Sequence, residues 1–92
     1  MLNKEYRILD SAFKHGITES EIDSVLSDMN PTRRIYDMHD DKNGVPQDMY
    51  VAHTGTRPWA IEVSVAYRET ETVIFHANRI SNEYRKFYEG ER

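Results

Sequence analysis

The sequence predicts an α+β fold with two N-terminal helices, a four-stranded antiparallel meander and a C-terminal helix. Three observations predict it. Apolar residues recur at helical spacing near both ends of the chain, they alternate with other residues over 59–67, and Asn43-Gly44 is a strong hairpin signal. A length of 92 residues fits one domain, 1–92, built around a single small core.

The first two helices are predicted by apolar stripes and by the signals at their ends. Residues 3–14 show apolar side chains at steps of four, three and four. The second helix, 19–29, starts after Thr18, which has Glu21 at the spacing of a capping box, and it stops before Pro31. The stripes are Leu2, Tyr6, Leu9 and Phe13 on the first helix, and Ile22, Val25, Leu26 and Met29 on the second.

The middle of the chain reads as short strands joined by turns, which favours a sequential meander with helices covering one face. If Val73, Phe75 and Ala77 face the core, then Ile74 and His76 face the open side of the sheet. The last helix is expected at 79–89 with Asn78 as its cap. The predicted strands are 33–39, 48–54, 59–67 and 72–77.

Composition narrows the class of protein. The chain has no cysteine, which excludes disulfides, thiolate zinc sites and a cysteine nucleophile, and fits a cytoplasmic location. No apolar run approaches the roughly 18 residues of a membrane span, so no membrane partner is expected. The net charge of −4 argues against strong nonspecific binding of nucleic acid. The four histidines lack metal-ligand spacing, so we expect neither a metal nor another cofactor.

One histidine is a candidate for chemistry. His76 ends the fourth predicted strand, with Glu62 expected on the same open face and Arg79 at the start of the following helix. These three could supply a base, an orienting carboxylate and a phosphate clamp, the parts that RNA cleavage through the 2′-hydroxyl requires. The structural alternative is a histidine bonded to a neighbouring strand and a solvated arginine. His15, His39 and His53 are expected to be surface or capping residues.

Three further residues are candidates for binding the substrate. Arg34 belongs to a basic pair, Arg33-Arg34, which is also typical of an exposed edge strand. Tyr50 offers a ring for stacking a base, if its strand places it on the same open face as His76. Asn78 lies beside the predicted catalytic residues in the sequence. The acidic stretches 19–28 and 37–48 are interpreted as solvated faces or as docking surfaces for a basic partner.

Two segments resemble a known family. Lys14-His15-Gly16-Ile17 before a short acidic helix resembles the Lys-His-Gly-Val/Ile segment of BrnT-type toxins. The run from Val73 to Arg79, before a helix with Glu83 and Tyr88, resembles that family's closing Ile-Ile-Ser-Ala-Arg-Lys segment. The resemblance covers most of the chain from residue 14 to 88. It implies a RelE-like α+β scaffold, a ribonuclease that arrests translation, and a cognate antitoxin as partner.

The departures from the family pattern leave two hypotheses. In the alignment implied by the resemblance, His76 takes the place of a serine, Asn78 that of an arginine, and Arg79 the next basic position. The family is also basic, whereas this chain is acidic. The first hypothesis is therefore a toxin-like, metal-independent endoribonuclease. The alternative is a non-catalytic protein-interaction domain on the same scaffold.

Overall fold

The fold is built on a central sheet, and the computed structural model describes residues 5–90 of the chain. It is a small α+β domain with a five-stranded mixed sheet and two α-helices. In chain order the elements are β1 (Arg7–Ile8), a 3-10 helix η1 (Asp10–Phe13), α1 (Glu19–Leu26), β2 (Arg34–Met38), β3 (Gln47–Ala52), β4 (Ile61–Tyr67), β5 (Thr72–Arg79) and α2 (Asn82–Gly90).

The sheet has the order β1-β5-β4-β3-β2. Strands β2 to β5 form consecutive antiparallel pairs, whereas β1 pairs in parallel with the start of β5, so that Arg7 lies opposite Val73. The prediction of a first helix over 3–14 beneath a four-stranded antiparallel sheet is therefore wrong. Residues 3 and 4 lie outside the described part of the chain.

Competition from the sheet explains this error. An isolated helix of about twelve residues is marginal in water, and the edge of β5 offers hydrogen-bonding groups to the same segment. The Leu9 N–H donates to the Ile74 carbonyl at 2.9 Å, and the Ser11 hydroxyl donates to the Phe75 carbonyl at 2.7 Å. The segment therefore continues the sheet as β1 and then turns through η1.

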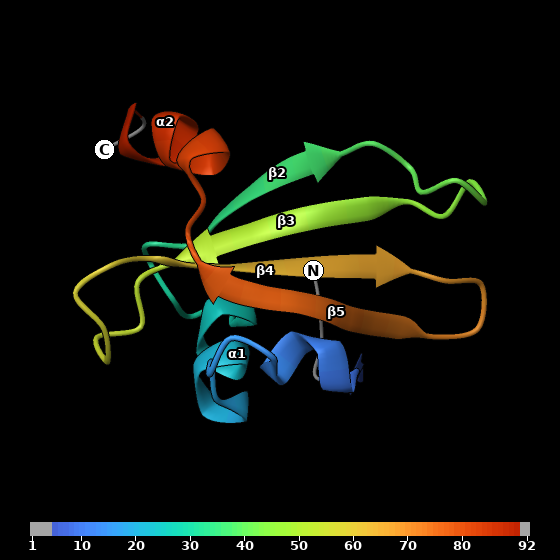
Figure 1. Ribbon diagram of the computed structural model, residues 1–92, viewed down its shortest axis with the longest axis horizontal. Helices are drawn as coiled ribbons and strands as arrows, with labels where there is room; N and C mark the ends of the chain where they lie inside the picture. The colour runs from blue at the N-terminus through green and yellow to red at the C-terminus, as the bar shows by residue number, and fades with distance from the viewer. Residues whose placement is uncertain (1–4, 91–92) are drawn as a thin grey trace.

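The two α-helices lie on opposite faces of the sheet, with α1 and η1 below it and α2 above it in Figure 1. Side chains from α1 pack with Tyr50, Val63 and Ile74 in one core cluster, and Tyr88 of α2 packs with Met49 and Val51 in the other. The expectation that helices cover one face is thus wrong. The alternation along β4 puts Glu62, Ser64 and Ala66 on the second face, and their small or polar side chains suggested that this face is exposed to solvent. All three are in fact buried.

A β-bulge in β5 changes which side chains face the first core. Ser64 pairs with His76 and Val65 pairs with Ile74, so Phe75 is the extra residue. Ile74 therefore packs on the α1 side, contrary to the sequence prediction. His76 pairs with Ser64, and Ser64 lies on the α2 side of the sheet, where it bonds to Met49. His76 is therefore on the α2 side and not in the α1-side core, as the sequence predicted.

The ends of the helices differ in how well they were predicted. The capping box at Thr18 is confirmed, with the Thr18 hydroxyl accepting from the Glu21 N–H at 3.1 Å. Helix α1 ends at Leu26, and Met29, which was placed in its buried stripe, is 88% exposed. Helix α2 begins at Asn82 because β5 continues to Arg79, so Asn78 is a strand residue and not a helix cap.

Candidate functional site

The centre of the candidate site is a hydrogen-bonded histidine and carboxylate on β5 and β4. His76 Nε2 lies 2.8 Å from Glu62 Oε2. The Glu62 side chain is only 6% exposed, whereas that of His76 is 32% exposed, so the ring reaches solvent and the carboxylate does not. The second carboxylate oxygen accepts a hydrogen bond from the Ser81 N–H at 2.7 Å. Both oxygens of Glu62 are therefore engaged, which fixes its orientation toward His76.

Two opposing influences set the ionisation of Glu62. Burial raises the pKa of the carboxyl group, because it disfavours the charged form. The hydrogen bond with His76 and those from Ser81 act in the opposite direction and leave the pKa of Glu62 below its ordinary value. Glu62 is thus an anion at neutral pH, and it can hold the imidazole of His76 in one orientation.

A second imidazole lies beside this pair. The ring centroids of His15 and His76 are 5.9 Å apart, and the planes are nearly perpendicular at 74°. His15 belongs to the connection between η1 and α1, which reaches β5 because η1 is bonded to the strand at Phe75. The sequence analysis missed this neighbour, since the contact depends on the parallel pairing of β1 with β5. His15 was expected to be a surface or capping residue, and the Lys14-His15-Gly16 segment was also part of the family resemblance.

The other predicted residues near the end of β5 divide between the two faces of the sheet. Asn78 pairs across the strands with Glu62 and therefore shares its face and that of His76. Arg79 pairs with Ile61, whose side chain belongs to the α1-side core, so Arg79 leaves the strand on the other face. The structure thus brings together His76, Glu62 and Asn78, and it separates Arg79 from them.

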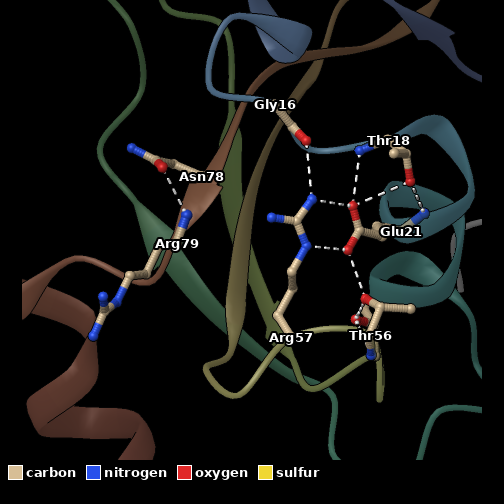
Figure 2. Close-up of polar contacts among 8 residues, drawn as sticks. Gly16, Thr18, Glu21, Thr56, Arg57, Asn78 and Arg79 are labelled. Atoms are coloured by element: carbon tan, nitrogen blue, oxygen red, sulfur yellow. Dashed lines mark hydrogen bonds and ion pairs between the residues drawn. The ribbon is translucent and has the colours of Figure 1, made fainter.

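Arg79 instead contributes to a group of cations around Trp59. Its guanidinium carbon lies 5.6 Å from the centre of the Trp59 ring, and that of Arg57 lies 5.3 Å from it. Figure 2 shows the Arg79 side chain directed away from Arg57. The backbone N–H of Arg79 donates a hydrogen bond to the Asn78 side-chain oxygen at 2.7 Å. Two arginines therefore share one indole at this end of the sheet.

A cavity of about 240 Å³ adjoins this group. It lies between the segment that leads into β4 and helix α2, and its walls include Trp59, Arg79, Arg85, Tyr88 and one acidic residue, Glu89. Guanidinium groups and aromatic rings in one small cavity are suited to an anionic, planar ligand such as a nucleotide. Arg85 is a further residue that the sequence analysis did not single out, because its position depends on where α2 begins.

Arg34 and Tyr50 lie away from this site. Arg34 is on β2, and the strands β3 and β4 separate β2 from β5. Its guanidinium donates to the carbonyl of Arg33 at 2.8 Å. Tyr50 is only 4% exposed on the α1 side of the sheet, where its hydroxyl lies 3.0 Å from that of Tyr67. The open face that would have joined Tyr50 to His76 does not exist, since both faces are covered.

A separate polar cluster holds α1 against the segment before β4 (Figure 2). The buried carboxylate of Glu21 accepts hydrogen bonds from Arg57 Nε at 2.8 Å and from the Thr56 hydroxyl at 2.5 Å. Arg57 also donates to the Gly16 carbonyl at 3.0 Å. The hydrogen bonds from Arg57 lower the pKa of Glu21, whereas burial raises it. Further hydrogen bonds from the hydroxyls of Thr56 and Thr18 also lower this pKa, which falls to about 2.

Comparisons with protein-family models, with curated proteins and with solved structures find no match to this chain. Within residues 5–90, no helix is long and apolar enough to cross a membrane. In the same part of the chain, no three histidine or acidic side chains gather in a way that could hold a metal ion. The functional argument therefore depends on the geometry of the residues described above.

Proposed function

We propose that this protein is a toxin-like endoribonuclease that cleaves RNA without a bound metal ion and arrests translation in the cytoplasm. The observation that carries the proposal is the His76–Glu62 hydrogen bond of 2.8 Å with the imidazole of His15 beside it. The resemblance to BrnT-type toxins supports the same function and adds a cognate antitoxin as the expected partner.

The proposed chemistry assigns one proton transfer to each histidine. In the neutral imidazole of His76, the carboxylate on Nε2 selects the tautomer with the proton on that nitrogen, which leaves Nδ1 with a lone pair. This nitrogen takes the proton of the RNA 2′-hydroxyl, whose oxygen attacks the adjacent phosphorus. His15, in its protonated form, gives a proton to the departing 5′-oxygen. The products are a 2′,3′-cyclic phosphate and a free 5′-hydroxyl.

The remaining residues take positioning and binding roles in this scheme. Glu62 orients His76, as the carboxylate does in other acid–base pairs. Asn78 shares their face and can donate to a non-bridging phosphate oxygen from its side-chain amide. Arg79 and Arg85 line the same cavity at the end of the sheet, apart from His76, so both bind a flanking phosphate and not the one that is cleaved.

The test is cleavage of a fluorogenic single-stranded RNA in the presence of EDTA. We expect 2′,3′-cyclic phosphate ends, and no cleavage when the substrate carries a 2′-deoxy group at the scissile nucleotide. His76→Gln should lower the rate by about 10²- to 10⁴-fold, the usual contribution of general acid–base catalysis. Glu62→Gln should lower kcat and shift the pH profile, because it changes the orientation and the charge partner of His76.

The matched control is Glu69→Gln, which removes an exposed carboxylate from the turn between β4 and β5. It should leave kcat and the pH profile unchanged. Cleavage that requires a divalent cation, or that survives His76→Gln at full rate, would contradict the proposal. A wild-type protein that releases no product from RNA would contradict it as well.

A further inference from the structure

A second surface, distinct from the site of His76 and His15, lies between β2 and α2, and His39 is part of its lining. It is a groove of about 520 Å³, and its apolar wall contains Tyr36, Tyr84 and Phe87. The ring of Tyr36 lies 5.8 Å from that of Tyr84 and 6.1 Å from that of Phe87, with interplanar angles of 41° and 38°. Phe87 remains 59% exposed although it packs against this ring. Three aromatic rings therefore face a space that nothing in residues 5–90 fills.

The groove borders an open edge of the sheet. Strand β2 is the last in the sheet order, so no other strand of the described chain pairs with its outer side. Ile35, on this strand, is 46% exposed. An edge strand beside an apolar groove accepts an extended peptide, because the backbone supplies hydrogen bonds and the groove receives alternate side chains.

The charge at this edge determines what the peptide must carry. Asp37 lies directly opposite Asp48 on the neighbouring strand, a like-charge pair that is unfavourable without a nearby cation. Glu83 lines the groove beside Tyr84 on α2. An arginine side chain fits such a groove, because its guanidinium stacks on aromatic rings and binds a carboxylate at the same time.

We propose that β2 binds an extended basic segment of a partner protein. The segment pairs antiparallel with β2, and its arginine, opposite Tyr36, enters the groove toward Glu83. The preceding residue of the segment is a lysine opposite Asp37, and the following one is apolar and opposite Ile35. Adjacent residues of a strand point to opposite faces, so the lysine and the arginine meet the two acids on the two faces of the sheet.

A second copy of this chain is a poorer occupant of the edge. Pairing of β2 with itself about Ile35 would bring Arg33 of the partner subunit opposite Asp37. In each chain, however, Arg33 is already bonded to Asp28 at 3.0 Å and to the Leu26 carbonyl at 2.8 Å. Pairing about Tyr36 would place Ile35 opposite Asp37 and supply no cation. A partner with its own lysine and arginine satisfies both acids.

The probe is a fluorescein-labelled peptide with the sequence Thr-Lys-Arg-Val-Thr, and its reference is Thr-Glu-Glu-Val-Thr. Binding to the full chain is measured by fluorescence anisotropy, and the site is located by amide chemical shifts. We expect saturable binding of the basic peptide only, with shifts at 34–38 and in α2. Asp37→Lys and Glu83→Lys should each weaken binding at least tenfold. The control Glu69→Lys makes the same charge change at an exposed turn and should leave the affinity unaltered.

Several results would overturn the proposal. They are the absence of binding at millimolar peptide, an equal loss of affinity in Glu69→Lys, and shifts that lie elsewhere. Sedimentation that shows a dimer blocking the peptide would assign the edge to a second copy instead. The proposal is independent of the ribonuclease, since Asp37 lies on β2, which β3 and β4 separate from His76 on β5; RNA cleavage by Asp37→Lys should equal that of the wild type.

Discussion

Glu21→Gln is expected to lower the free energy of unfolding by about 3 kcal/mol at pH 7. The pKa of Glu21 falls from 4.5 to about 2 in the folded protein, and each tenfold change in an ionisation constant is worth about 1.4 kcal/mol. The folded state therefore favours the anion by about 3 kcal/mol. Glutamine has no charge and brings N–H groups toward the guanidinium of Arg57, so this contribution is lost.

Chemical denaturation followed by far-UV circular dichroism measures the effect. Dichroism is preferred to fluorescence because Arg57 stacks on Trp59. At a urea slope of about 1.5 kcal/mol per molar, typical of a small domain, the midpoint should fall by about 2 M. The control is Glu71→Gln, which breaks the exposed pair with Arg7 and should leave the midpoint nearly unchanged.

The pH dependence gives an independent check of the same reasoning. Because the folded pKa of Glu21 is depressed, its stabilisation is fully present above about pH 4.5 and is lost as the pH falls toward 2. The wild type should therefore lose about 3 kcal/mol from this group in that window, and Glu21→Gln should show a correspondingly smaller loss. A cost below 1 kcal/mol at pH 7, or the same acid dependence in both proteins, would refute the assignment.

Two further substitutions test the packing and the turns by urea denaturation. Ile22→Ala removes a fully buried side chain of α1 and should cost about 3 kcal/mol, whereas Met29→Ala, at an exposed position, should change little; equal costs would contradict the boundary of α1. Gly44→Ala should cost about 1 kcal/mol from backbone strain alone, since φ is +78° and no heavy atom beyond the adjoining residues lies within 4 Å of the added methyl group; an unchanged midpoint would show that the turn tolerates alanine.

Local signals predicted those elements whose determinants lie within a few residues. The capping box of Thr18 and Glu21 is such a case, because the two side chains bond across a single turn of helix. The prediction failed where a distant segment competes. The apolar residues of the first predicted helix can also be buried when the segment pairs with β5 as a strand. The periodicity of the sequence does not show that the outer edge of β5 is free to pair with it.

The candidate site shows the same division. The pairing of His76 with Glu62 could be predicted, because β4 and β5 are neighbours in the chain and a short turn joins them. His15 could not, since it arrives through a parallel pairing of segments more than sixty residues apart. The position of Arg79 was mistaken because the sequence suggested a helix there, whereas the continuing strand turns its side chain to the other face.

The distribution of charge bears on the proposal that an acidic chain binds RNA. The net charge of −4 counts Glu21 and Glu62 in full, but both are buried and each is paired with a basic side chain. Arg57 offsets the charge of Glu21 in that ion pair, so the basic character of this end of the sheet rests on Arg79 and Arg85, which line the cavity beside Trp59. Asp37 and Glu83 remain exposed at the opposite edge, on β2 and α2. Separating the two signs in this way would let one small domain bind the proposed RNA and the proposed basic peptide without competition between them.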